Sequence, residues 1–213
     1  MRYCVAISPS TESAVCSANR GLRYNGPMAG QRESLKARRF VDMAGVLSWC
    51  GFLSLLAKHT EKCLKAKLAA FRRAEEVLIP HIGVKFRISE FSGRATAAIA
   101  EHWEPTPRHP DSRWDWTEIM RRHRDPDRLD FAIWDDEEKL CAAGLGLTSG
   151  ASLMLRFFEG SPRMDCKLKG RRILVALEVS ANYAQGLGKE ELRIQSVNSA
   201  LESLYRERMA LSV

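Results

Sequence analysis

Apolar residues recur at helical spacing through the first half of this 213-residue chain. Leu64, Leu68 and Phe71 return near every third or fourth position, with Lys and Arg between them. This spacing is typical of an amphipathic helix, and it predicts helices over residues 31–58 and 60–79.

Individual residues predict where these elements begin and end. Thr60 can cap the second helix, and Pro80 follows its last expected turn. Residues 84–88 alternate apolar and basic side chains, which favours a short strand or a turn. The Ala-rich residues 89–103 predict a third helix, and the Pro-rich residues 105–110 then predict a loop.

A short helix is expected within residues 111–124, where Ser112 or Asp115 can serve as the N-cap. Trp114 and Trp116 lie at its start. We interpret both indole rings as core packing rather than as a ligand-stacking surface.

From residue 129 onward the hydrophobic period changes to two. Strands are predicted at residues 129–134, 139–147 and 153–158, with a polar turn at 135–138 and a Gly-containing turn at 148–150. Because short turns join consecutive strands, we expect an antiparallel meander.

The chain then passes through a basic loop into a helix. Residues 171–187 are predicted to be helical, and Gly188 is the expected C′ residue. A strand at residues 191–195 follows, and Asn198 can cap a last helix that reaches about Arg208.

The basic loop is the strongest chemical signal in the sequence. Lys167, Lys169, Arg171 and Arg172 surround Gly170. A strand that leads through a Gly-containing loop into a helix can bind phosphate, because backbone N–H groups and the helix dipole both favour negative charge there. A pyrophosphate-bearing cofactor is the first hypothesis. The alternative is that the four cations lie on a solvated surface turn.

Composition excludes several classes of protein. No window approaches 18 consecutive apolar residues, so no membrane span is expected. The six cysteines form no CxxC pair and the five histidines are scattered, which argues against a metal site or a disulfide framework. The cysteines, Cys141 included, are expected to act as small hydrophobic residues in a reducing cytoplasm.

The first 30 residues lack the apolar core of a secretory signal. We expect them to be disordered, apart from a weak strand signal at residues 3–7, or to be an over-extended start with the true beginning near Met28 or Met43. Residues 1–87 hold fifteen Lys and Arg against six Asp and Glu, whereas the rest of the chain is close to balanced. Basic stretches can contact nucleic acid, but solvated helix faces are commoner.

The second half of the chain, from about Trp114 to the C-terminus, resembles the GNAT superfamily of acetyl-CoA-dependent N-acetyltransferases. Residues 129–150 look like that family's second and third strands. LMLRFFEG, the KLKGRR loop and the following helix look like its fourth strand, pyrophosphate loop and next helix. The segment ELRIQSVNSALESLYRER is similar to the strand and helix that follow, and it is the most specific part of the match.

The resemblance implies a mixed α/β fold, mainly an antiparallel sheet flanked by helices, with acetyl-CoA as co-substrate. Lys167 stands at the first position of the family's pyrophosphate motif and Gly170 at its Gly, while the bulky Arg172 replaces a small residue. Backbone amides near Gly170 to Arg172 would hold the pyrophosphate, with Lys169 and Arg171 beside them. Asn198 would contact the pantetheine arm or the helix start, and Tyr205 would protonate the departing thiolate.

Other polar residues carry weaker expectations. Glu159 follows the third strand of the meander, where a carboxylate can take the proton from an attacking amine, although a Glu at a strand end is more often solvated. Asp130 and Glu178 are weaker candidates for the same role. Tyr183 is expected to be core packing.

We therefore expect three segments. Composition and periodicity predict a disordered segment over residues 1–30 and a helical extension over 31–110, and the resemblance implies a GNAT-like domain over 111–213. No residues follow Val213 to form the family's last two strands, so the N-terminal half or a partner would replace them, or the domain would be degenerate. The expected reaction is direct attack of a small-molecule or protein amine on the acetyl thioester. The alternatives are a catalytically inactive acyl-CoA-binding relic and a basic nucleic-acid-associated accessory protein, and a homodimer is an open possibility.

Overall fold

The computed structural model describes residues 2–6, 43–108 and 113–195, with side chains from residue 54 onward. The chain divides into two compact units, one of residues 10–57 and one of residues 1–9 with 58–213. Only the start of one long helix is described in the first unit. The sheet and the candidate site belong to the second unit.

The second unit is built on one six-stranded sheet with the order β1-β6-β5-β4-β3-β2. Neighbouring strands are antiparallel, except that β5 and β6 run parallel. The strands are β1 (Arg2–Ala6), β2 (Phe86–Ser89), β3 (Leu129–Asp135), β4 (Leu140–Ser149), β5 (Ser152–Gly160) and β6 (Glu191–Gln195).

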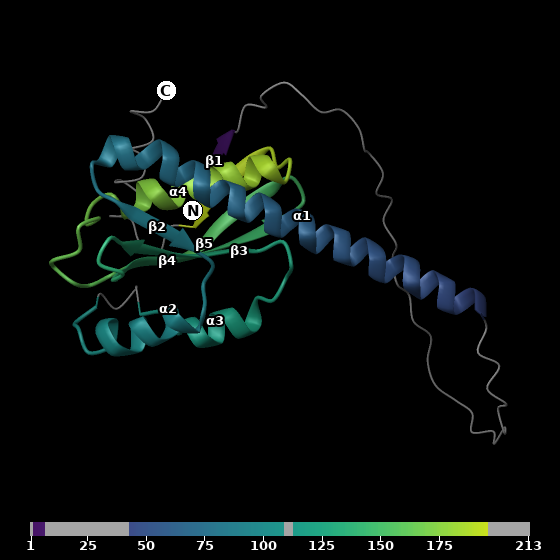
Figure 1. Ribbon diagram of the computed structural model, residues 1–213, viewed down its shortest axis with the longest axis horizontal. Coiled ribbons are helices and arrows are strands. Elements are labelled where there is room, and N and C mark those ends of the chain that lie inside the picture. Colours follow the sequence, from purple (N-terminus) through teal and green to yellow (C-terminus); the bar gives the residue numbers. More distant parts are fainter. Residues whose placement is uncertain (1, 7–42, 109–112, 196–213) are drawn as a thin grey trace, which may run out of the picture. The chain divides into compact units, whose positions relative to one another are not determined.

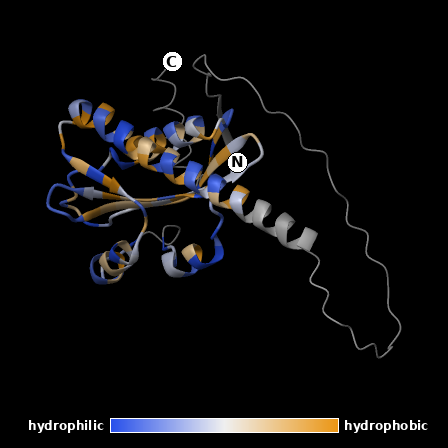
Figure 2. Cartoon of the chain, turned by 45° about the vertical axis from the view of Figure 1, so that its right-hand side comes forward, coloured by the Kyte–Doolittle hydropathy of each residue, from blue (hydrophilic) through white to orange (hydrophobic). Residues whose placement is uncertain are grey.

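Helices cover both faces of this sheet (Figure 1). They are α1 (Met43–Ile82), α2 (Gly93–Ala98), the π-helix η1 (Ile99–Trp103), α3 (Trp116–Arg122) and α4 (Arg172–Gly186). Helices α1 and α4 share one hydrophobic core with the sheet, and α2, η1 and α3 share a second core with its other face. Figure 2 shows hydrophobic colour concentrated in the strands between these two helical layers.

This architecture confirms the expected fold class, a mixed α/β fold with a mainly antiparallel sheet, flanking helices and an N-terminal helix. The meander is present as β3, β4 and β5, and the strand predicted at residues 191–195 is β6. The weak signal at residues 3–7 corresponds to β1. The segment boundaries at residues 30 and 110 stay predictions, while α1 and β2 of the expected extension pack within the sheet unit.

The expected break between two N-terminal helices is wrong, because α1 continues through Thr60 and Pro80. Phe71, Ala74 and Leu78 lie on one buried stripe of this helix and pack on the sheet. Burial of that stripe outweighs the local cap signal. Pro80 lies in the last turn, where it removes only a hydrogen bond near the helix end.

The predicted third helix is shorter than expected and changes type. It begins after Ser92 as α2 and continues as the π-helix η1. Asp115 is the N-cap of α3, as expected, and its Oδ1 accepts a hydrogen bond from the Glu118 N–H at 2.9 Å. Trp116 is buried, which agrees with core packing.

Close packing of β3 on β4 depends on a glycine. A Cβ placed on Gly144 would overlap the ring of Phe131, which lies on the face of the sheet that packs against α1 and α4. The backbone of β4 is therefore in direct contact with that ring, and no larger residue fits without displacing it.

We expect Gly144→Ala to lower the free energy of unfolding by about 1–3 kcal/mol, because the Phe131 ring must move to admit the methyl group. Urea denaturation with a common slope for both proteins measures the change. Gly93→Ala is the matched control, since a Cβ there meets open space, and it should change stability by less than about 0.5 kcal/mol. Equal stability of the two variants would contradict the packing described here.

Candidate functional site

The candidate site lies where β5 leads into α4. Among the strand pairs of the described chain, β5 and β6 form the only parallel pair, and α4 is the crossover that joins them. In α/β sheets, ligands bind outside the carboxyl ends of parallel strands. The carboxyl end of β5 continues directly into the basic loop and the N-terminus of α4.

The parallel pairing stops before β5 ends. The last paired residues are Leu155 and Ile194, whereas β5 continues to Gly160, hydrogen-bonded to β4. Arg156 is the extra residue of a β-bulge, because Leu145 pairs with Phe157 and Gly146 pairs with Leu155. A bulge bends a strand and increases its twist. The edge of residues 156–160 that faces away from β4 has no strand partner among the described residues.

The N-terminus of α4 carries no side-chain cap. Arg171 is the N-cap residue, it offers no side-chain acceptor, and the first turn holds no acidic residue. The first backbone N–H groups of a helix have no partner within the helix. Gly170 precedes them at a φ of +80°, and a Cβ added there would meet no atom within 4 Å. The Arg171 N–H donates to the Leu168 carbonyl at 2.9 Å, so the amides that follow it in the first turn of α4 are the candidate anion donors.

The side chains of the loop cations mainly hold the loop in place. Arg172 Nη1 donates to the Ser161 carbonyl at 2.5 Å, and Arg171 Nη1 donates to the Ile82 carbonyl at 2.5 Å. Lys169 Nζ lies 3.0 Å from the sulfur of Met164. Two of the four predicted cations are thus hydrogen-bonded to backbone carbonyls rather than arranged around an empty anion site.

Lys167 is held by the turn between β3 and β4. Its Nζ lies 2.6 Å from Asp136 Oδ1 and 2.8 Å from Glu137 Oε1. Asp136 and Glu137 raise the pKa of Lys167, and hydrogen bonds from Lys139 and Lys167 lower the pKa of Glu137 to about 2. The bridge fastens the loop to the neighbouring hairpin at an exposed position.

Glu159 lies on the segment of β5 that pairs with β4 alone, and its side chain contacts Trp116 of α3. Its carboxylate accepts from Trp116 Nε1 at 2.8 Å and from Arg108 Nη1 at 2.9 Å. Burial raises the pKa of Glu159, although the hydrogen bonds from Trp116 and Arg108 act in the opposite direction. The expectation of a solvated strand-end carboxylate is wrong, because this side chain is buried.

Arg108 and Trp116, the two hydrogen-bond partners of Glu159, also line a cavity of about 330 Å³. It lies between η1 and α3, and its lining includes Arg108, Arg113, Trp114 and Trp116. The indole N–H of Trp114 is buried there without a hydrogen-bond partner. Arg108 and Trp116 were not identified as site residues from the sequence, since nothing in their spacing links them to Glu159.

A second buried cluster lies at the start of β3. Lys67 Nζ lies 2.8 Å from Asp130 Oδ1, and Arg128 Nε lies 3.2 Å from the same oxygen. A cavity of about 510 Å³ borders this cluster. Asp130 is therefore held by two cations, and the one from Lys67 connects α1 to the sheet.

Tyr183 is buried, and its hydroxyl donates to the Asp127 carbonyl at 3.0 Å, as expected for core packing.

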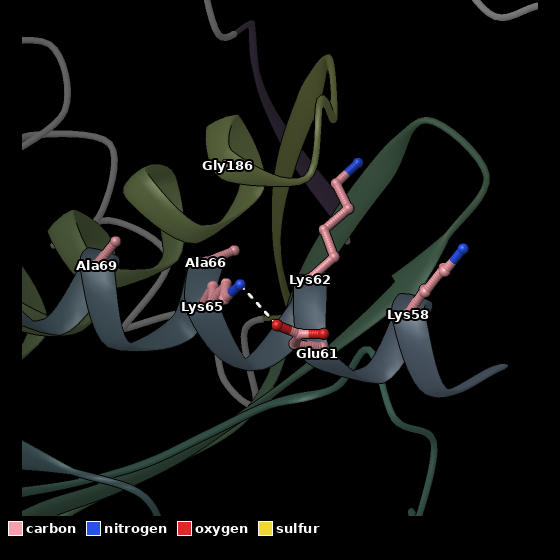
Figure 3. A pocket seen from close by; sticks show the side chains of 7 residues that line it. All are labelled: Lys58, Glu61, Lys62, Lys65, Ala66, Ala69 and Gly186. Carbon is pink, nitrogen blue, oxygen red and sulfur yellow. Dashed lines mark ion pairs between the residues drawn. The ribbon is translucent and has the colours of Figure 1, made fainter. Parts of the chain in front are cut away.

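A third cavity, of about 460 Å³, lies between α1 and α4 (Figure 3). Small residues line it, namely Ala66, Ala69 and Gly186, and three lysines surround them with Glu61. Glu61 pairs with Lys65 at 2.6 Å, and Lys62 extends away from that pair. None of the three cavities is lined by the loop of residues 161–171.

The predicted site residues Asn198 and Tyr205 lie outside the described residues.

No protein-family model matches this chain. No curated protein matches it either. The solved structures similar to it include the GCN5-related N-acetyltransferase from Sphaerobacter thermophilus, with 16% identity and a TM-score of 0.36, and nourseothricin acetyltransferase, with 18% identity and a TM-score of 0.38.

These similarities cover only part of each molecule. The first covers 51% of this chain and 35% of the Sphaerobacter protein, so this chain spans about a third of that protein's length. The second covers 57% of this chain and 81% of the other protein. The first neighbour belongs by its name to the superfamily that the sequence resembles. Such partial likeness carries no information about the reaction.

No described helix is both long enough and apolar enough to cross a membrane.

We expect Arg172→Ala to lower the free energy of unfolding by about 1.5–3 kcal/mol, because the Ser161 carbonyl loses a charged donor. Lys169→Ala removes an exposed cation from the same loop and should change stability by less than about 0.5 kcal/mol. Thermal and urea unfolding of both variants measure the difference. Two variants of equal stability would show that Arg172 does not anchor the loop.

Proposed function

We propose that this protein is an acetyl-CoA-dependent N-acetyltransferase. One observation carries the proposal: the only parallel strand pair of the described sheet ends early, beside an uncapped helix N-terminus. A diphosphate can bind the N–H groups of that helix, and an extended pantetheine arm can lie along the unpaired edge of β5. Acetyl-CoA combines these two chemical features with a reactive thioester.

The proposed cofactor contacts are the backbone amides near Gly170 to Arg172. Of these, the Arg171 N–H donates to the Leu168 carbonyl at 2.9 Å, so it must exchange that partner for a phosphate oxygen. Lys167 and Lys169 add positive charge near the phosphates. Lys167 also forms ion pairs with Asp136 and Glu137, which partly neutralise it. Asn198 is proposed to contact the pantetheine arm. The guanidinium of Arg172 donates to the Ser161 carbonyl, which directs the bulk of this side chain away from the proposed phosphate position.

The proposed reaction is direct attack of an amine nitrogen on the thioester carbonyl. The new C–N bond forms as the C–S bond breaks, and Glu159 accepts the proton that the amine releases. Its raised pKa moves the carboxylate closer to the basicity of a working general base. Tyr205 is proposed to return a proton to the departing thiolate.

The acceptor is proposed to be a small-molecule or protein amine, and the proposed site of action is the cytoplasm. The 330 Å³ cavity next to the Glu159 partners is a place where a polar acceptor can enter. The lysine-lined groove between α1 and α4 is where the alternative, binding of nucleic acid, would act.

Gly170→Glu tests the cofactor site, because it places a carboxylate beside the amides proposed to bind phosphate. We expect calorimetry to show acetyl-CoA binding weakened at least about tenfold, a change of about 1.4 kcal/mol in binding free energy. Gly188→Glu is the matched control. Gly188 has a φ of +71° and equally open surroundings, but it follows the C-terminus of the same helix. It should bind acetyl-CoA as the unmodified chain does.

Equal weakening in both variants, or in neither, would contradict the placement of the diphosphate. Acetyl-CoA binding without turnover over a broad amine panel would favour the inactive relic. Absence of acetyl-CoA binding, together with oligonucleotide binding that weakens steeply as salt rises, would favour the nucleic-acid-associated protein.

The role of Glu159 predicts the pH profile of turnover. A general base works when ionised, so kcat/KM should fall on the acid side through a pKa above the usual carboxyl range of about 4.3. Glu159→Gln should remove this acid limb and lower kcat by about 10²–10⁴-fold. Glu118→Gln is the control, because Arg121 and Arg122 lower the pKa of the half-buried Glu118 to about 2. A Glu159→Gln enzyme that keeps the acid limb would exclude this base.

A further inference from the structure

A buried indole N–H beside the π-helix η1 lacks an acceptor. Among the described residues, Trp114 Nε1 is the only buried side-chain nitrogen or oxygen atom without a hydrogen-bond partner. Its ring packs edge-on against Phe157 of β5, with 5.0 Å between the ring centroids, so the indole is held in place. A buried donor without a partner costs free energy, and a bound group that supplies an acceptor removes this cost.

Trp114 belongs to the lining of the cavity of about 330 Å³ between η1 and α3. This volume lies near the lower end of the range for small-molecule sites, so the cavity suits a molecule about as large as a single amino acid. The π-helix η1 supplies part of the wall through Ile99 and Ala100. Because π-helical turns occur frequently at functional sites, the wall points to a ligand independently of the indole N–H.

Charged side chains of both signs line this cavity. Arg108 and Arg113 are positive, whereas Glu104 and Asp115 are negative. Neither Arg113 nor Glu104 forms a salt bridge with another described residue, and both side chains are exposed. A ligand with a single charge would be repelled by half of these groups. A zwitterion can pair its carboxylate with the arginines and its ammonium with the acidic residues.

The guanidinium of Arg108 is positioned to bind a carboxylate. Its side chain is 12% exposed, and its Nη1 donates to Glu159 at 2.9 Å. Glu159, which also accepts from Trp116 Nε1, is the only acceptor of Arg108 among the described residues. An arginine has five N–H donors, so others remain for a second carboxylate. Glu159 offsets part of the positive charge and fixes the direction of the guanidinium.

We propose that this cavity binds a small aliphatic α-amino acid in its zwitterionic form. The carboxylate accepts hydrogen bonds from Arg108 and from the indole N–H of Trp114. The ammonium group pairs with Glu104 or Asp115, which lie in the same lining. The aliphatic side chain packs against Ile99, which is buried in the wall of the cavity.

The inference rests on the proposed function in one respect, namely that the amino acid is the acetyl acceptor. The ammonium group loses one proton to solvent, and the resulting amine nitrogen attacks the thioester carbonyl. Binding of the amino acid itself requires neither acetyl-CoA nor turnover. It can therefore be measured on the protein alone.

Titration of the ¹⁵N-labelled chain with L-leucine, without acetyl-CoA, measures this binding. We expect saturable shifts in the amides of residues 96–104 and 113–117. Isocaproate has the carboxylate and carbon chain of leucine without its amine, and isoamylamine has the amine without the carboxylate. Each analogue should bind at least about tenfold more weakly than leucine, because it loses one set of charged contacts.

Trp114→Phe removes the indole N–H and keeps an aromatic ring beside Phe157. Leucine should bind this variant about tenfold more weakly, because the carboxylate loses one donor. Trp134→Phe is the matched control and should bind leucine as the unmodified chain does. The Trp134 Nε1 donates to Ser89 Oγ, and this residue does not line the cavity.

Arg113→Gln is a second variant, chosen because an exposed residue can be changed without disturbing the core. It should also weaken leucine binding. Arg121→Gln removes the same charge from α3 outside the cavity and should leave binding unchanged. Gly170→Glu should bind leucine normally while it loses affinity for acetyl-CoA, so the two proposed sites are tested separately.

Three results would overturn the amino-acid site. They are the absence of leucine-dependent shifts in residues 96–104 and 113–117, single-charge analogues that bind as tightly as leucine, and equal affinity of Trp114→Phe and Trp134→Phe. Leucine binding by a chain that does not bind acetyl-CoA would support the site and contradict the proposed function. Leucine that binds but is not acetylated, by a protein that acetylates another amine, would contradict its role as the acceptor.

Discussion

The parallel pairing of β5 with β6 is the constraint on which the rest of this structure depends. A parallel pair requires a crossover, and α4 is that crossover, so the end of β5 must lead through a loop to the N-terminus of a helix. The remaining strand pairs are antiparallel and need only turns or longer connections on the same sheet. The parallel pair therefore determines where backbone N–H groups become available for an anion.

The protein holds this loop with charges that are directed away from the helix N-terminus. Arg171 is tied to the end of α1, Arg172 to the loop start, and Lys167 to the β3–β4 turn. Cations beside a helix N-terminus are unfavourable for the helix itself. Carbonyl and carboxylate partners of the side chains relieve that cost. The Arg171 N–H donates to the Leu168 carbonyl, and the amides after it in the first turn of α4 are the candidate anion site.

Periodicity in the sequence was sufficient to predict the strands of the meander, β6, α4 and the Asp115 cap, because each depends on neighbouring residues. It did not predict the continuity of α1, since burial of its apolar stripe against the sheet overrides Thr60 and Pro80. The buried partners of Glu159 and the Lys67–Asp130 pair join residues more than 40 positions apart. Only the folded sheet brings such residues together, so no local pattern could have revealed them.

The central claim is that the N-terminus of α4, at the carboxyl end of the parallel pair, binds a diphosphate. Titration of the ¹⁵N-labelled chain with acetyl-CoA, followed by amide chemical shifts, measures this most directly. The account predicts that the largest shifts fall on the amides of Gly170 to Ile173 and along residues 156–160. Shifts confined to the groove between α1 and α4, or to the cavity beside Lys67 and Asp130, would contradict it.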